Sequence, residues 1–253
     1  MNPTYLLLLL LLPFNSSNQE QTIAAGVFRW PSMPEAKNKS ISTVMLSGNA
    51  YDLSHLEVIA QQLAPGKKSR VKVDTEEQLL LIKAGTLTIT LNDSIFSLGK
   101  GSIAMMMPGE KYSLQNNGPA GCQFHVMKYK SKLPVDLARG QSSGGSFIKD
   151  WDKLTFRPHE RGGVRSYFDR STAMTKRFEM HVTTLKGNFK SHDPHQHRAE
   201  EIILVLEGSV EMLIGENSYQ AGAGDVLFAP TNVFHGLKNS GDVPCSYFAF
   251  QWE

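Results

Sequence analysis

Short segments in which apolar and polar residues alternate recur along most of this chain. Residues 86–91 alternate threonine with leucine and isoleucine, and residues 178–183 alternate Phe, Met and Val with Glu, His and Thr. A period of two residues is typical of a strand with one buried face. Glycine, proline and asparagine separate these segments, so the pattern predicts an all-β sandwich or barrel. Short helical turns are expected only near Ser54–Gln62 and Pro134–Arg139.

The second half of the chain repeats the first at a spacing of 123 residues, which is the separation of Gly85 and Gly208. LLLIKAGTLTITL parallels IILVLEGSVEMLI, and QNNGPAGCQFHV parallels KNSGDVPCSYFA. The period is too long for a solenoid and indicates a duplicated domain. We therefore expect an N-terminal domain at residues 27–130, a linker at 131–146 that contains QSSGG, and a C-terminal domain at 147–253.

The chain begins with an apolar run from Tyr5 to Phe14 that includes seven consecutive leucines. This run is too short to span a bilayer but suits the core of a secretory signal peptide, which we place at residues 1–18. A buried helix is the alternative, and the absence of any polar face disfavours it. The protein is therefore expected to be exported, periplasmic or secreted, with no stable membrane insertion after cleavage. Without cleavage it would be cytoplasmic.

Charge and cysteine content exclude some classes of protein. The net charge is +2, and no basic stripe interleaved with aromatic residues occurs, so a nucleic-acid partner is not expected. The two cysteines, Cys122 and Cys245, occupy equivalent positions in the repeat. They could pair in an exported protein, but two buried free thiols are the preferred interpretation.

Four residues in the second half form a candidate metal site: His195, His197, Glu201 and His235. His195 and His197 share one face if their segment is extended. Glu201 can return to that face after a bend, and His235 can come from a later strand. A single histidine on a strand is more often a packed or surface residue, whereas the full set is specific. Three imidazoles and a carboxylate suit one divalent transition metal (manganese, iron, nickel, cobalt or zinc), with manganese or iron favoured.

The first half lacks this set. At the repeat spacing, the positions of the four candidate ligands hold Lys72, Asp74, Gln78, and either Tyr112 or Ser113. A protonated lysine has no lone pair to donate, so this half is expected to bind no metal. Lys72 and Asp74 either form an ion pair in place of the metal or are simply solvated.

Further residues are candidates for chemistry near the metal. The catalytic candidates are Glu179, His181 and Glu200, and the candidates for binding an anionic substrate are Arg165, Lys176 and Arg177. Glu179 and His181 share a strand face that can look into a barrel. Glu200 competes with Glu201 as a ligand, but the spacing to Gly208 favours Glu201, which leaves Glu200 on the other face. His192 precedes the motif and could shuttle protons at the mouth. Ordinary solvated surface is the alternative for most of these charged groups.

The motifs resemble those of the cupin superfamily, and the duplication resembles a bicupin. The segment from His195 to Gly208 fits H-x-H-x3-E-x6-G, although Phe189 stands at the position of the leading glycine. The segment from Gly224 to Asn239 fits the second motif, except that Asn232 replaces its central glycine. The resemblance implies two tandem double-stranded β-helix (jelly-roll) barrels with metal only in the C-terminal one.

The resemblance implies a metal-dependent enzyme that acts on a small, polar, anionic metabolite, such as a sugar acid, a keto acid or a ureide. Hydrolase, lyase and isomerase chemistry are all compatible with it. An iron-dependent dioxygenase is one alternative, and a non-catalytic carbohydrate- or small-ligand-binding protein stabilised by its metal is another. Fold analogy does not choose among them. Pairing of exposed edge strands makes a homodimer the expected assembly.

Overall fold

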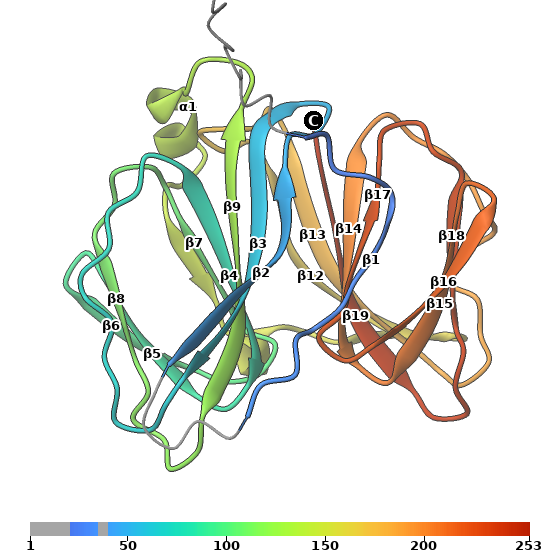
Figure 1. Cartoon of the computed structure of the whole chain (residues 1–253), viewed down its shortest axis with the longest axis horizontal. Helices are drawn as coiled ribbons and strands as arrows, with labels where there is room; N and C mark the ends of the chain where they lie inside the picture. Colours follow the sequence, from blue (N-terminus) through green and yellow to red (C-terminus); the bar gives the residue numbers. More distant parts are fainter. Residues whose placement is uncertain (1–20, 35–39) are drawn as a thin grey trace, which may run out of the picture.

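The computed structural model describes residues 21–34 and 40–253 of this chain. The expected signal peptide at 1–18 lies outside the described residues. The described chain forms four β-sheets arranged as two sandwiches that lie side by side (Figure 1). No helix within the described ranges is long and apolar enough to cross a membrane. The all-β fold with two similar halves is the one that the alternating pattern and the repeat predict.

The N-terminal sandwich consists of a six-stranded and a three-stranded sheet. The larger sheet has the order β10 (Phe147–Lys149), β7 (Ile103–Met106), β4 (Glu77–Ala84), β9 (Cys122–Ser131), β3 (Leu53–Leu63) and β2 (Ile41–Gly48). The smaller sheet has the order β6 (Ser94–Leu98), β5 (Leu87–Leu91) and β8 (Tyr112–Gln115).

The C-terminal sandwich has the same plan. Its larger sheet has the order β1 (Gly26–Phe28), β17 (Val226–Ala229), β14 (Glu200–Glu207), β19 (Cys245–Trp252), β13 (Phe178–Leu185), β12 (Gly162–Arg170) and β11 (Arg157–His159). Its smaller sheet has the order β16 (Asn217–Gly222), β15 (Ser209–Ile214) and β18 (His235–Asn239). The described residues also form two short helices, α1 (Leu137–Ser142) and the 3-10 helix Trp151–Lys153.

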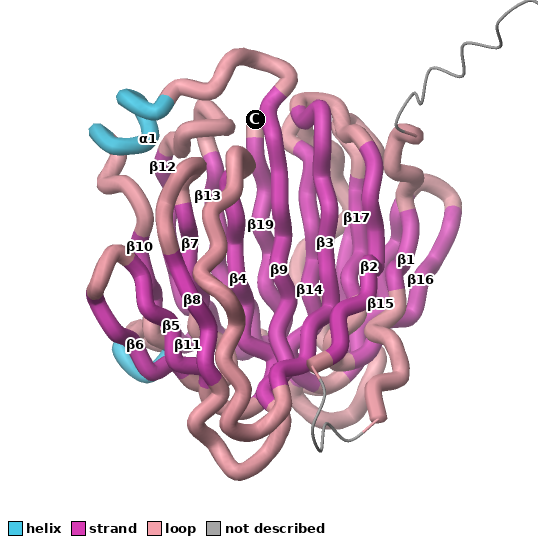
Figure 2. The backbone as a smooth tube through the Cα atoms, turned by 60° about the vertical axis from the view of Figure 1, so that its left-hand side comes forward, coloured by secondary structure: helices cyan, strands magenta, loops and turns pink. Residues whose placement is uncertain are grey.

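One helical prediction is wrong. Ser54–Gln62 lies inside β3, a long strand of the six-stranded sheet (Figure 2). Leu56, Val58 and Ala60 are all buried there, so alternating apolar positions decide the conformation. The second predicted turn, Pro134–Arg139, overlaps α1. Asp136 caps that helix, since its side chain accepts a hydrogen bond from the backbone amide of Arg139.

The hydrophobic core has three layers. One fills the N-terminal sandwich, one fills the C-terminal sandwich, and the largest lies between the two large sheets and takes residues from both halves. Strands of the large sheets therefore have two buried faces, which explains their nearly continuous apolar runs. On β14, Ile202 and Leu204 face the layer between the halves, whereas Ile203 and Val205 face the C-terminal sandwich.

The halves exchange their first strands. β1 comes from the start of the chain but pairs with β17, and β10 begins the expected C-terminal domain but pairs with β7. Each exchanged strand leads to a tryptophan that covers a glycine of the opposite half. A Cβ on Gly224 would lie 2.8 Å from Trp30, and one on Gly101 would lie 2.3 Å from Trp151. Both glycines also have positive φ, so only glycine suits these positions.

Each half also offers a buried glutamate to the other. Glu77 accepts hydrogen bonds from the backbone amides of residues 173 and 174, at 3.2 and 3.3 Å. Its repeat equivalent, Glu200, accepts them from the amides of residues 51 and 52, at 2.7 and 3.5 Å. These pairs, the exchanged strands and the shared core join the two sandwiches into one folding unit.

Candidate metal centre

Two strands and one loop bring the candidate ligands together. Glu201 lies on β14 and His235 begins β18, while His195 and His197 lie in the segment that precedes β14. Backbone hydrogen bonds of 2.9 and 2.8 Å join His195 and His235 in both directions as an isolated bridge. The bridge places the two imidazoles side by side, so segments separated by 40 residues in sequence meet at one point.

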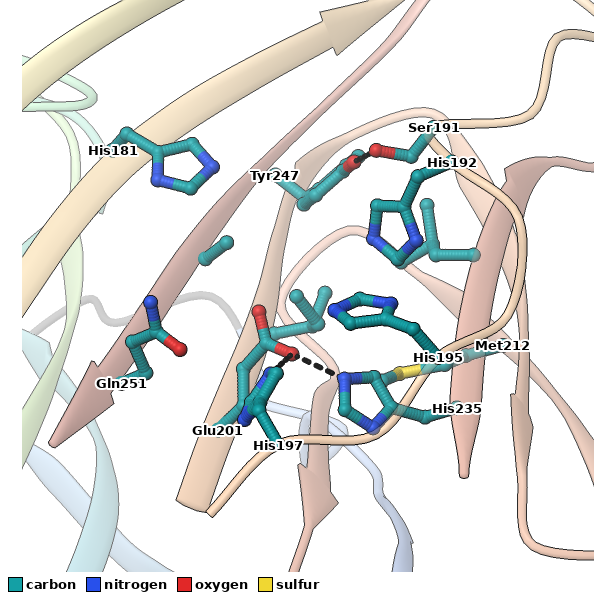
Figure 3. Close-up of a pocket in the computed structure, with 13 residues that line it drawn as sticks. His181, Ser191, His192, His195, His197, Glu201, Met212, His235, Tyr247 and Gln251 are labelled. Carbon is teal, nitrogen blue, oxygen red and sulfur yellow. Dashed lines mark hydrogen bonds and ion pairs between the residues drawn. The ribbon is translucent and has the colours of Figure 1, made fainter. Parts of the chain in front are cut away.

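The four side chains converge in Figure 3. One nitrogen from each of His195, His197 and His235 lies within 4.8 Å of the others, an arrangement that can hold a metal ion. Glu201 completes the group, because its Oε2 lies 3.0 Å from Nε2 of His235 and 3.8 Å from Nε2 of His197. Strand alternation places Glu201 on the same face as Ile203, toward the interior of the C-terminal barrel.

Backbone carbonyls fix which nitrogen two of the histidines present. Nδ1 of His235 lies 2.7 Å from the carbonyl oxygen of Val233, and Nδ1 of His197 lies 2.9 Å from that of Ala199. Each Nδ1–H therefore donates to a carbonyl, which leaves an Nε2 lone pair directed at the cluster. Within the described residues, the buried Nε2 of His235 has no hydrogen bond of acceptable geometry, although Glu201 is close. A lone pair facing a carboxylate in this way fits a cation between them.

The charges of the cluster shift its pKa values. Burial raises the pKa of Glu201, but the adjacent imidazole of His235 and the charges of His197 and His181 outweigh this and hold the pKa below its usual value. Burial lowers the pKa of His235, and Glu201 more than reverses that effect. The pKa of His195 is lowered by burial and by the neighbouring histidines. A carboxylate that stays ionised beside a cluster of imidazoles is the electrostatic pattern of a cation site.

A cavity of about 230 Å³ lies above the four residues. Its other lining residues are His181, Ser191, His192, Ile203, Met212, Leu237, Tyr247, Ala249 and Gln251. Apolar side chains form much of this wall. Its polar groups come from β13 and β19 and from the loop that holds Ser191 and His192. This composition is that of a small-molecule pocket with a few orienting groups.

A histidine–glutamate pair stands at one side of the cavity. Nδ1 of His181 lies 2.8 Å from the carboxylate of Glu179, and His181 lines the pocket. Their alternation with buried Phe178 and Met180 turns both side chains away from the layer between the halves. Burial lowers the pKa of His181, but the hydrogen bond and charge of Glu179 outweigh it and leave the pKa raised.

Sequence reasoning missed two polar residues of the pocket. Ser191 accepts a hydrogen bond of 2.8 Å from the hydroxyl of Tyr247, and Gln251 lies one alternation beyond Ala249 on β19. The alternation of Tyr247, Ala249 and Gln251 carried the signal, because one face of a strand lines one cavity. Ser191 carried no signal, since it lies in a loop.

Glu200 is not in the pocket. It alternates with Glu201 and faces the layer between the halves, where the indole of Trp252 donates to it at 3.2 Å. Burial raises the pKa of Glu200. Its carboxylate holds the backbone of residues 51 and 52, outside the pocket lining.

The three basic candidates for substrate binding also lie outside the pocket lining. Arg165 lies opposite Val182, on the face toward the other half, and its guanidinium stacks 4.1 Å from the ring of Trp151. Arg177 forms a bidentate pair with exposed Asp169, at 2.8 and 2.9 Å. Lys176 lines a different cavity. The sequence could not reveal this, because the direction of a side chain near a strand end depends on the sheet.

The equivalent position in the N-terminal half is closed by protein side chains. The hydroxyl of Tyr112 donates a hydrogen bond to Gln78. Asp74 forms its ion pair with Lys128, at 2.7 Å, rather than with Lys72. The ammonium group of Lys72 lies 5.8 Å from the ring centroid of Tyr112. The side chains at the positions equivalent to the candidate metal ligands therefore contact other side chains of the N-terminal half.

The cysteines are free and buried, as the repeat predicts. Burial raises the pKa of Cys122 to about 12 and that of Cys245 to about 11. Both thiols are therefore unreactive packing groups rather than nucleophiles.

Comparisons with known proteins agree with this architecture. Residues 181–250 match the Cupin domain family. An oxalate decarboxylase from Lactobacillus farciminis, solved as a formate complex, superposes with a TM-score of 0.70 at 14% identity and covers 93% of this chain and 88% of its own. A glyoxylate-induced protein from Pseudomonas aeruginosa superposes with a TM-score of 0.68 at 18% identity, with coverages of 96% and 93%.

A third structure, AerE from Microcystis aeruginosa, gives a TM-score of 0.64 at 17% identity and covers 87% of this chain and 98% of its own. No curated protein matches the chain in sequence. Identities this low establish the fold and leave the reaction open. Residues 181–250 thus match a cupin domain, and the chain has a bicupin fold. Within the described residues, its histidine triad occurs only in the C-terminal half.

Proposed function

We propose that the C-terminal barrel binds a single divalent transition metal and catalyses a metal-dependent reaction on a small, oxygen-rich metabolite. His195, His197, Glu201 and His235 would hold the metal, with manganese or iron favoured among metals that accept imidazole and carboxylate. The observation that carries the proposal is the fixed direction of Nε2 in His197 and His235, toward Glu201, beneath a cavity.

The residues beside the cluster suit proton transfer. When bound, the metal would act as a Lewis acid on a substrate oxygen. Glu179 holds Nδ1 of His181, which leaves Nε2 of His181 to exchange a proton with a molecule in the pocket. Tyr247, held by Ser191, and Gln251 can orient that molecule by hydrogen bonds. A purely structural metal site would not need this set of polar groups facing a cavity.

The pocket wall narrows the substrate class. Among the described residues that line it, none is lysine or arginine. A substrate carboxylate would therefore have its charge balanced by the metal or by His181, and the rest of the molecule would contact Met212, Leu237 and Ala249. A keto acid, a sugar acid or a ureide of few atoms suits a cavity of about 230 Å³.

Metal analysis combined with a substrate screen tests the proposal. The purified protein should contain a transition metal, and a panel of keto acids, sugar acids and ureides should include a substrate whose turnover His197→Ala abolishes. Oxygen consumption with iron loaded would assign dioxygenase chemistry within that result. Absence of any transition metal, or full turnover by His197→Ala, would overturn the proposal. Tight ligand binding without turnover of any compound would contradict the catalytic part.

A further inference from the structure

We propose that the loop at Tyr51–Asp52, which belongs to the N-terminal half, positions the ligand-bearing segment His195–Glu201 of the C-terminal half. The inference rests on the proposed metal site and deepens it. The N-terminal half, whose own equivalent position is closed, would hold the loop that carries His197 and the start of the strand that carries Glu201.

Two contacts tie this loop to the segment, and each involves a residue next to a candidate ligand. Arg198, which follows His197, forms a bidentate pair with Asp52 at 2.7 and 2.8 Å. Glu200, which precedes Glu201, accepts the backbone amide of Tyr51 at 2.7 Å. The guanidinium of Arg198 also lies 5.3 Å from the centroid of the Tyr51 ring.

The segment needs such ties because little sheet structure holds it. Residues 196–199 belong to no strand, and β14 begins only at Glu200. Within the C-terminal half, the amide of Asn232 donates to the carbonyl of His197 at 2.8 Å, and the hydroxyl of Thr231 donates to that of Arg198. Through its pair with Asp52, the side chain of Arg198 also attaches this segment to the N-terminal half. Such attachment matters because ligands must be held in position for a metal to bind tightly.

The repeat provides an internal comparison. The glutamate–amide contact exists in both halves, through Glu77 and Glu200, so it serves the joint between them. The ion pair does not. At the repeat spacing, Arg198 corresponds to Thr75 and Asp52 corresponds to Thr175, and neither threonine can form such a pair. The ion pair is thus present at the segment that carries the histidines and absent at the equivalent segment, which lacks them.

The pair is too exposed to be explained by stability alone. The side chain of Arg198 is 48% exposed and that of Asp52 is 23% exposed. Partly exposed ion pairs contribute little to folding, because solvent screens them. A neutral replacement should leave the fold intact and loosen the segment, which separates a positioning role from a structural one.

The experiment compares Asp52→Asn with the wild type and with Asp169→Asn. The control removes the carboxylate of the pair between Asp169 and Arg177, which is also bidentate and partly exposed and includes no residue of the segment 195–201. Cobalt(II) affinity is measured by competition with a chromophoric chelator, and the visible spectrum of bound cobalt(II) reports ligand geometry. We expect Asp52→Asn to bind cobalt(II) about tenfold more weakly with an altered spectrum, and Asp169→Asn to match the wild type.

Conservative variants complete the test. Arg198→Lys keeps the charge but not the two-pronged geometry, so it should weaken binding as Asp52→Asn does, while Asp52→Glu should recover part of the affinity. Wild-type affinity and spectrum in Asp52→Asn would overturn the inference and leave the metal site standing. An equal loss in Asp169→Asn would overturn it too. A wild-type protein that binds no cobalt(II) would overturn the proposed function together with this inference.

Discussion

Glu200 and Glu201 are neighbours on β14, and their carboxylates face different halves of the protein. Glu201 lies 3.0 Å from Nε2 of His235 inside the C-terminal barrel, whereas Glu200 lies 2.7 Å from the backbone nitrogen of Tyr51 in the N-terminal half. Strand alternation alone produces this division. The candidate metal centre and the joint between the halves are therefore one residue apart.

His197→Ala should remove the bound metal. Its Nε2 is directed at the cluster by the bond from Nδ1 to Ala199, so the change deletes one preset donor of the triad. Elemental analysis of the purified variant should show about a tenfold or greater loss of metal relative to the wild type. Lys72→Ala is the matched control, because it alters the closed equivalent position in the other half. Metal loss in Lys72→Ala would contradict the assignment of the site to one half.

Glu77→Ala should destabilise the fold without affecting the metal. The change leaves the buried backbone amide of residue 173 without its acceptor, and the amide of residue 174 keeps only the hydroxyl of Thr172. Such a loss costs about 1–3 kcal/mol of unfolding free energy. Urea denaturation of the wild type, Glu77→Ala and Glu77→Gln should show the largest loss for alanine, because glutamine keeps one acceptor oxygen. Equal losses in the two variants would argue against the acceptor role of Glu77.

His125 should make the fold sensitive to acid. It is fully buried on β9, and its Nε2 donates to the carbonyl of Gly224 at 2.9 Å. Burial lowers its pKa to about 4 from an ordinary value near 6.5. The unfolded chain therefore binds this proton first, so the contribution of His125 is complete above about pH 6.5 and is lost as pH falls toward 4. A shift of this size corresponds to about 3 kcal/mol.

His125→Phe should flatten this part of the pH profile. The repeat already holds Phe248 at the equivalent position, so the ring has a precedent in the fold. Denaturant unfolding between about pH 7 and pH 4 should show a smaller decline in unfolding free energy for the variant, together with a modest loss at neutral pH from the missing hydrogen bond. An unchanged slope would show that His125 does not set the acid sensitivity.

Glu179→Gln should lower the pKa of His181. In the wild type the hydrogen bond and charge of Glu179 overcome the effect of burial, and without that charge burial dominates. NMR titration of the metal-free protein should place the pKa of His181 above its ordinary value in the wild type and below that value in Glu179→Gln. The same pKa in both proteins would rule out Glu179 as the group that tunes His181.

Much of the fold could be predicted from the sequence, because the relevant signals are local or repeated. Alternation in 86–91 and 178–183 predicts strands, and the equal spacing of glycines and cysteines predicts two similar halves. Prediction failed at 54–62, where a short helical turn was expected and the buried positions Leu56, Val58 and Ala60 belong to a strand. The export prediction for 1–18 and the homodimer stay predictions.

The sequence by itself determined the β architecture, the duplication and the candidate ligand set, since each depends on residue type and spacing along one chain. Only the tertiary structure decided which face each side chain occupies relative to the opposite half. Arg165, Lys176 and Arg177 all lie outside the pocket lining. Arg165 stacks on Trp151, Arg177 pairs with Asp169, and Lys176 lines another cavity. The tertiary structure also placed Asp52 beside Arg198, a contact between residues 146 positions apart that no local pattern encodes.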